Sequence, residues 1–132
     1  MTDSESQKRN APLPLIYSCS GCSNIAQLAN EVAIVLHREK KAEMSCIAGV
    51  GGGVRSLVKV AKSGRPIIAL DGCPLHCVKN CLELHDIQTN HHYTLTEYGI
   101  KKHPNLDFDP QDFHRIKAKV LDNIEGCSSQ SQ

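Results

Sequence analysis

The sequence has no surplus of charge of either sign, no long apolar run and no apolar leader segment. Its 15 Lys and Arg residues balance 14 Asp and Glu residues, so no overall field steers the chain to nucleic acid or to an anionic membrane. No run of about 18 apolar residues is present to span a bilayer. Residues 1–12 are polar and lack the apolar segment of a secretory signal. We therefore expect a cytoplasmic protein with no nucleic-acid or membrane partner.

Cysteine, by contrast, is abundant, with seven residues in a chain of 132. Cytosolic thiol buffers disfavour structural disulfides, so we expect these thiols to be free, bound to metal or reactive. The length suits one domain with its own hydrophobic core, which needs no disulfide for stability. We expect that domain at residues 13–126, between disordered polar tails at 1–12 and 127–132. Cys127, beside the second tail, is treated as incidental.

Short apolar runs alternate with helical patterns along the chain. Strands are predicted at residues 13–18, 43–48, 66–70 and 92–96. Helices are predicted from an N-cap at Asn24 to about Lys40, over 54–61, from an N-cap at Cys73 onward, and from Asp109 to Gly126. A tight glycine turn is expected at 49–53. This alternation predicts an α/β protein: a single small Rossmann-like three-layer domain with a mostly parallel four-stranded sheet.

Cysteines follow three of the predicted strands. Cys19 comes directly after the first strand, Cys46 lies at the end of the second, and Cys73 follows the third. In open parallel sheets, ligands bind beyond the carboxyl ends of the strands, where the chain changes direction across the sheet. We therefore expect cysteines on loops at the C-terminal ends of the strands to lie along one edge.

Two short cysteine pairs predict a metal site. Soft thiolates are the ligands of zinc, of iron–sulfur clusters and of copper(I), and a tetrahedral site needs four donors. Cys19 and Cys22 supply two donors, and Cys73 and Cys77 supply two more. If a helix begins at Cys73, Cys73 and Cys77 share one of its faces, as two ligands of one ion require. The predicted cofactor is therefore zinc, held by these four cysteines.

Other polar residues near these pairs have weaker assignments. Cys46 and Cys81 are reserve ligands. Either Cys77 and Cys81 form the helical ligand pair while Cys73 does something else, or Cys81 packs as a small buried hydrophobe. Cys46 is either a ligand at the edge of the sheet or a packing residue at the strand end. Asp71, at a strand end, either bonds backbone N–H groups of its own turn or supports a ligand from behind. His76 is expected to be exposed, since it lies off the face that carries Cys73 and Cys77. His92, at a strand start, is expected to be a surface or packing residue.

Three alternatives stay open beside zinc binding. The Cys19/Cys22 pair has the strand-to-helix context of a redox CxxC, and Cys73 is predicted at a helix start, where thiolates are favoured. Either could support redox or sulfur-transfer catalysis. A second alternative is an iron–sulfur cluster protein, and a third is a domain that only buries its thiols. Whether the protein is an enzyme is left undecided by these patterns.

Three motifs, in this order, resemble the DGC-domain family, which is named for an Asp-Gly-Cys turn. They lie at residues 17–23, 44–53 and 71–77, and the resemblance runs from about Leu15 to Leu84, more weakly to about Lys102. The family's zinc assignment is inferred from its potential chelating cysteines. The resemblance implies a bacterial or archaeal cytoplasmic protein with a metal site. By motif position the chelating set would be Cys19, Cys22, Cys73 and Cys77, with Cys46 and Cys81 as further motif cysteines.

Overall fold

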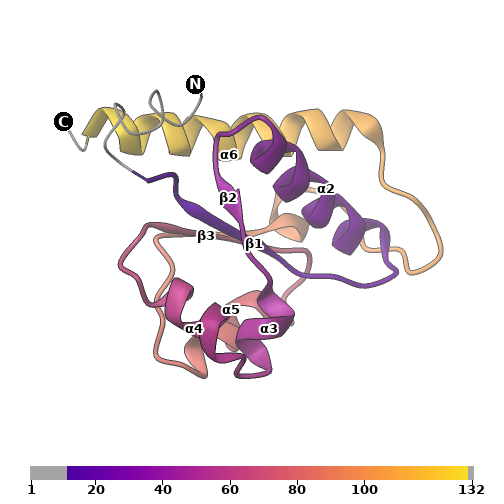
Figure 1. Ribbon diagram of the computed structural model, residues 1–132. Coiled ribbons are helices and arrows are strands. Elements are labelled where there is room, and N and C mark those ends of the chain that lie inside the picture. The colour runs from indigo at the N-terminus through magenta and orange to yellow at the C-terminus, as the bar shows by residue number, and fades with distance from the viewer. Residues whose placement is uncertain (1–11, 131–132) are drawn as a thin grey trace.

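Four parallel strands form one sheet in the order β2-β1-β3-β4. The structure is a computed structural model that describes residues 12–130 (Figure 1). Its strands are β1 (Leu15–Ser18), β2 (Glu43–Met44), β3 (Ile67–Asp71) and β4 (His91–Thr94). The predicted α/β class and parallel four-stranded sheet are confirmed. The fourth strand ends earlier than predicted, because a 3₁₀ helix, η1 (Leu95–Tyr98), follows it.

The two central strands, β1 and β3, are buried along their whole length. Their sequences, LIYS and IIALD, are nearly continuous apolar runs, as expected of parallel strands covered on both faces. From β1 the chain moves outward to β2, and it then returns to the other side of β1 to form β3. The direction therefore changes between β1 and β3, and their carboxyl ends border the crevice where α/β proteins bind ligands.

Two helices cover one face of the sheet, α2 (Asn24–Arg38) and α6 (Pro110–Gln130) (Figure 1). The N-cap of α2 is Ser23, whose hydroxyl accepts a bond from the Ala26 N–H, and not Asn24 as predicted. Helix α6 also continues past Gly126, its predicted end, to Gln130. One glycine costs a helix interior only about 1 kcal/mol relative to alanine, which is too little to end a packed helix.

Three short helices cover the other face: α3 (Ile47–Gly51), α4 (Arg55–Ala61) and α5 (Cys77–Glu83) (Figure 1). The strand predicted at 43–48 is shorter than expected, because β2 has two residues, and the glycine turn predicted at 49–53 is wrong for its first three residues, because α3 extends to Gly51. The glycines serve close helix packing. A Cβ on Gly49 would lie 2.1 Å from Leu57 Cδ1, and one on Gly51 would lie 2.8 Å from Cys81 Sγ.

Helix α5 begins at Cys77 and not at Cys73, so the predicted N-cap is wrong. Residues 73–76 form a turn in which the His76 N–H bonds the Cys73 carbonyl at 3.2 Å. His76 then takes a left-handed conformation, with φ 54°. Cys73 and Cys77 therefore do not share a helix face, whereas Cys77 and Cys81 do.

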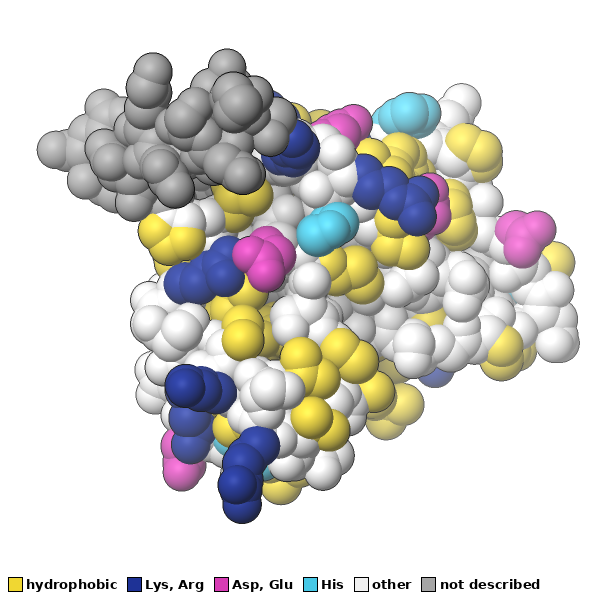
Figure 2. Space-filling view, in the orientation of Figure 1, with side chains coloured by type: hydrophobic (Ala, Val, Ile, Leu, Met, Phe, Trp, Pro, Cys, Tyr) yellow, Lys and Arg dark blue, Asp and Glu magenta, His cyan; other side chains and the backbone are white. Residues whose placement is uncertain are grey.

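The outer surface carries charges of both signs. Lys and Arg side chains occur across the face shown in Figure 2 together with Asp and Glu, as the balanced composition suggests. Among residues 12–130, no helix combines the length and apolarity needed to cross a bilayer. Residues 1–11 of the predicted N-terminal tail and residues 131–132 lie outside the described residues, as does the side chain of Cys127.

Candidate functional site

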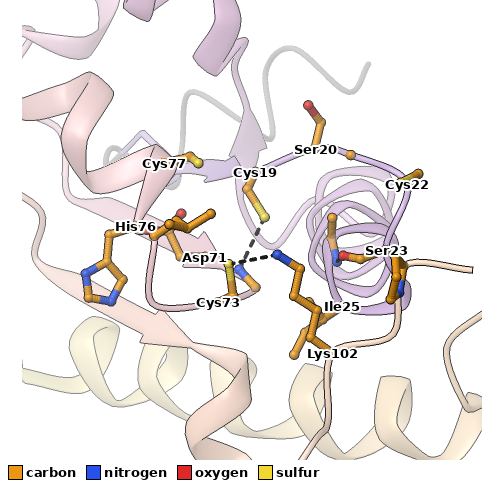
Figure 3. Close-up of a pocket in the computed structure, with 15 residues that line it drawn as sticks. Cys19, Ser20, Cys22, Ser23, Ile25, Asp71, Cys73, His76, Cys77 and Lys102 are labelled. Carbon is orange, nitrogen blue, oxygen red and sulfur yellow. Dashed lines mark hydrogen bonds between the residues drawn. The ribbon is translucent and has the colours of Figure 1, made fainter.

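A pocket of about 260 Å³ lies at the carboxyl ends of β1 and β3 (Figure 3). Cys19 directly follows β1, and Cys73 lies two residues beyond the end of β3. Cys22 and Cys77 line the same pocket. The sheet topology thus brings all four cysteines of the predicted ligand set to one cavity, from two stretches of chain that are far apart in sequence.

Cys19 is the buried thiol of this pocket, with 8% of its surface exposed. Its backbone N–H bonds the Leu70 carbonyl at 3.0 Å, which continues the pairing of β1 with β3. Burial raises the pKa of the Cys19 thiol from 9.0 to about 11, although the Gly72 N–H, 3.2 Å from the sulfur, acts in the opposite direction. Negative charge at Asp71 and at the Cys77 and Cys73 sulfurs raises this pKa further. At neutral pH, Cys19 is therefore a protonated thiol.

Asp71 holds the start of α5 in place. Its carboxylate is fully buried, and it accepts bonds from the Val78 N–H at 2.8 Å and the Lys79 N–H at 3.3 Å. It also contacts the His92 ring nitrogen at 2.8 Å. The N-cap residue of α5, His76, makes no side-chain cap of its own. Asp71 therefore caps α5 from the neighbouring strand, and it bonds the N–H groups of this helix instead of those of its own turn.

Gly72 lets the end of β3 approach the start of α2. A Cβ at this position would lie 2.9 Å from Ile25 Cγ2 and 3.1 Å from the Ile25 backbone carbon and oxygen. Backbone atoms cannot move aside as a flexible side chain can, so only glycine fits here without a shift of α2. In the Asp-Gly-Cys turn, Asp71 thus holds the start of α5, Gly72 permits the close approach of α2, and Cys73 lines the pocket.

His76 is half-buried, so the prediction that it is exposed is wrong. One ring nitrogen lies 3.0 Å from the Thr94 hydroxyl. Its ring also packs edge-on against His92, with 4.9 Å between ring centroids. The left-handed backbone turns the His76 side chain toward β4 instead of toward solvent. Together with Asp71, these residues form a polar network that ties the turn at the pocket to β3 and β4.

Lys102 is the functional candidate that the sequence reasoning missed. Its ammonium donates a hydrogen bond to Cys73 Sγ at 3.5 Å (Figure 3). Asn24 holds this loop: its side-chain amide donates to the Lys101 carbonyl at 2.9 Å, and its oxygen accepts from the His103 N–H at 2.7 Å. The Asn24 side chain thus serves this loop, while Ser23 caps α2. No local pattern could have found Lys102, which lies 29 residues from Cys73.

The four pocket cysteines are not assembled around one point. Figure 3 shows Cys22 and Cys77 on opposite sides, with Cys19 and Cys73 between them. Both Cys22 and Cys77 are exposed. Within residues 12–130, no group of three or more Cys, His, Asp and Glu side chains lies close enough together to hold a metal ion in this conformation. The four thiols therefore share a pocket without forming a ready coordination shell.

Of the described cysteines, Cys46 and Cys81 lie outside the pocket. Cys46 caps α3, its sulfur accepting a bond from the Gly49 N–H at 3.4 Å. Cys81 is half-buried beside Gly51, where α5 packs on α3. Burial raises the pKa of the Cys81 thiol, and negative charge at Cys77 and Asp71 adds to the effect. The two reserve residues thus serve a helix cap and a helix contact.

Fold and site together define an α/β domain with a thiol-lined pocket at its switch point. Comparison with known families matches residues 15–120 to the DGC domain, and the chain belongs to this family. The chain is similar to "Anaerobic and virulence modulator AnvM" of Pseudomonas aeruginosa, with 61% identity over 109 residues, or 83% of each chain. No solved structure matches the chain. The family resemblance drawn from the three motifs is confirmed.

Proposed function

We propose that this chain is a regulatory protein that binds a thiophilic metal ion in the pocket between β1 and β3. Zinc is the preferred candidate. Cys19, Cys22, Cys73 and Cys77 would be its ligands. The observation that carries this proposal is the presence of all four thiols in one pocket at the switch point of the sheet. A regulatory role agrees with the name of the similar P. aeruginosa protein, which describes a modulator.

The chemistry of the pocket suits a soft metal ion. Thiolates are preferred ligands of zinc. Hydrogen bonds from N–H donors to the ligand atoms orient the ligands and adjust the properties of the metal. Two donors already contact sulfur here, the Gly72 N–H at Cys19 and the Lys102 ammonium at Cys73. Asp71 is occupied by α5 and His92, so it would support the site without being a ligand.

Metal binding would have to displace a proton and move two side chains. Because the pKa of Cys19 is raised to about 11, the ion would compete with a proton there, and affinity should increase with pH. Cys22 and Cys77 would turn inward from the sides of the pocket. Four thiolates would close the shell and suit a structural role. Three with an open position would suit sensing or metal transfer.

Metal content and thiol counting test this proposal. The protein is purified without air, and zinc, iron and free thiols are measured before and after treatment with a chelator. We expect about one zinc per chain, with the pocket thiols protected until zinc is removed. Cys73→Ser should lose most of the zinc, while Cys46→Ser, which changes a cysteine outside the pocket, should keep it.

Two results would contradict zinc binding at this site. Full zinc retention in Cys73→Ser would exclude Cys73 as a ligand, and an absence of zinc in the unaltered protein under these conditions would exclude the proposal itself. Iron with a brown visible absorbance would instead indicate an iron–sulfur cluster on the same thiols.

A second candidate function is thiol chemistry at Cys73, such as redox or sulfur-transfer chemistry. The contact between Cys73 Sγ and the Lys102 ammonium favours it, because a thiolate formed there would be held by a positive charge. The Cys19/Cys22 pair is the weaker choice for this role. Cys19 is buried with a pKa raised to about 11 and so carries little thiolate at neutral pH. Fast alkylation of Cys73 in the metal-free protein would support this candidate.

A further inference from the structure

We propose that the pocket of the metal-free protein recognises a small anionic disulfide. Cys73 would be the sulfur that exchanges with this disulfide, and Lys102 would be the cation that selects its charge. This inference rests on the second candidate function, a reactive Cys73, and it adds the substrate class and the residue that determines specificity.

The charge of the pocket favours an anion. Among the side chains that line it, Lys102 carries the permanent positive charge. The one carboxylate of the lining, Asp71, is engaged by the Val78 and Lys79 N–H groups and by the His92 ring. A carboxylate group on a ligand in this cavity would therefore find Lys102 as its partner.

Cys73 is better placed than the other cysteines to react with such a ligand. Of the six described cysteines, it is the one whose sulfur accepts a hydrogen bond from a charged side chain. The sulfurs of Cys19 and Cys46 accept bonds from backbone N–H groups. Cys73 is also half-buried at the pocket, whereas Cys19 is enclosed. A disulfide that enters the pocket thus meets the Cys73 sulfur beside the Lys102 ammonium.

The position of Lys102 is built into the fold. Asn24, the first residue of α2, bonds the backbone on both sides of Lys102: its side chain contacts Lys101 and His103, and its own N–H bonds the His103 carbonyl at 3.0 Å. The loop is therefore fixed at the residues that flank Lys102. The side chain of Lys102 is exposed, and from this fixed backbone its ammonium reaches Cys73 Sγ.

The size and the walls of the pocket limit the ligand to a short one. Its volume is about 260 Å³, and apolar side chains of Ile25, Ala26, Leu75 and Pro104 contribute to its lining. This space suits one arm of a small aliphatic disulfide, with the second arm pointing to solvent. The chemical class is thus a disulfide with short arms that end in carboxylates.

The covalent step is thiol–disulfide exchange. Cys73 gives up its proton to solvent, and its thiolate attacks one sulfur of the disulfide, R–S–S–R. A Cys73–S–S–R bond forms as the S–S bond of the reagent breaks, and R–S⁻ leaves and takes up a proton. One disulfide replaces another, so no further oxidant or reductant is required.

Three disulfides of similar size but different charge test the inference on the full chain after zinc removal. Dithiodiglycolate is a dianion, bis(hydroxyethyl) disulfide is neutral, and cystamine is a dication. Rates of adduct formation at each cysteine are measured by acid quenching and peptide mass analysis. We expect Cys73 to prefer dithiodiglycolate over the neutral reagent by about fivefold or more at low salt, and to react slowest with cystamine. The exposed Cys22 of the same protein should show a weaker preference.

Substitution of Lys102 separates charge recognition from general reactivity. Lys102→Gln should abolish the charge preference at Cys73, Lys102→Arg should keep it, and Lys101→Gln, an exposed neighbour, should leave it unchanged. Added salt should reduce the preference, because the interaction is electrostatic.

Two different failures can be told apart. If Cys73 reacts readily with all three reagents and Lys102→Gln slows them equally, the inference about an anionic ligand is overturned while Cys73 remains reactive. If Cys73 reacts no faster than Cys22 with any reagent, the second candidate function fails together with the inference.

Discussion

Replacement of Asp71 by alanine tests how the Asp-Gly-Cys turn holds the pocket together. The carboxylate is fully buried and caps α5 from β3, with hydrogen bonds at 2.8 Å and 3.3 Å and a contact to His92 at 2.8 Å. In Asp71→Ala, the Val78 and Lys79 N–H groups at the start of α5 would lose their acceptor. The His92 ring would lose its anionic partner as well.

The expected loss can be worked out from these contacts. A hydrogen bond to a charged group contributes roughly 1.5–3 kcal/mol, and Asp71 makes two such bonds to backbone N–H groups in addition to the His92 contact. The carboxylate no longer has to be desolvated in the variant, which returns part of this energy. We therefore expect the free energy of unfolding to fall by roughly 3–5 kcal/mol.

Asp71→Asn should have an intermediate effect. Its amide oxygen can still accept the Val78 N–H, but its NH₂ group then faces the Lys79 N–H, where the wild-type protein has an acceptor. The variant keeps the shape of the side chain and loses one helix-capping bond, so we expect a loss of roughly 1–3 kcal/mol.

Urea unfolding of the metal-free protein, followed by far-ultraviolet circular dichroism, measures these changes. Asp122→Ala is the matched control, because Asp122 is an exposed residue of α6, and such surface changes usually stay within about 0.5 kcal/mol. If Asp71→Ala differed from this control by less than about 1 kcal/mol, the account of Asp71 as the cap of α5 would be refuted.

Three further predictions concern the walls of the pocket. Gly72→Ala should destabilise the protein by about 1–3 kcal/mol in the same urea assay, because the added Cβ would meet the Ile25 backbone at 3.1 Å; an unchanged midpoint would contradict the close approach. Asn24→Ala removes two side-chain bonds to the 101–103 loop, and should both lower stability by about 1–3 kcal/mol and weaken the charge preference of Cys73 in the disulfide assay. The raised pKa of Cys19, about 11 against 9.0, means that between these values the unfolded chain releases a proton that the folded protein keeps, so stability should fall as pH rises from about 9 to about 11. Relative to Cys19→Ala, this fall should approach about 3 kcal/mol, and parallel pH profiles of the two proteins would refute it.

Much of the fold follows from hydrophobic patterns along the chain. The central strands were predictable because buried parallel strands are short apolar runs with little ambiguity, as in IIALD. Short-range sequence patterns gave wrong predictions where contacts between distant residues determine the local structure. The glycines at 49–53 look like a turn, yet two of them let α3 pack closely against Leu57 and Cys81. These contacts join residues that no short-range pattern relates.

The start of α5 shows the same limit at the candidate site. Pro74 and the residue before it fit a helix start at Cys73, but the helix begins at Cys77, since its first N–H groups are capped by Asp71. The convergence of four cysteines on one pocket could be predicted from strand order alone. Lys102 could not, because its place depends on bonds between Asn24 and a loop that follows η1.

The two proposals for the pocket make opposite demands on one sulfur. Zinc bound to Cys73 would occupy the lone pairs that attack a disulfide, and a mixed disulfide at Cys73 would remove a thiolate from the ligand set. Zinc-loaded protein should therefore resist modification at Cys73, and protein modified at Cys73 should bind zinc weakly. Lys102 would act in both states through the same contact with the Cys73 sulfur. If both proposals hold, the pocket links metal occupancy to the supply of small disulfides, which is a chemical basis for a regulatory protein that responds to redox conditions.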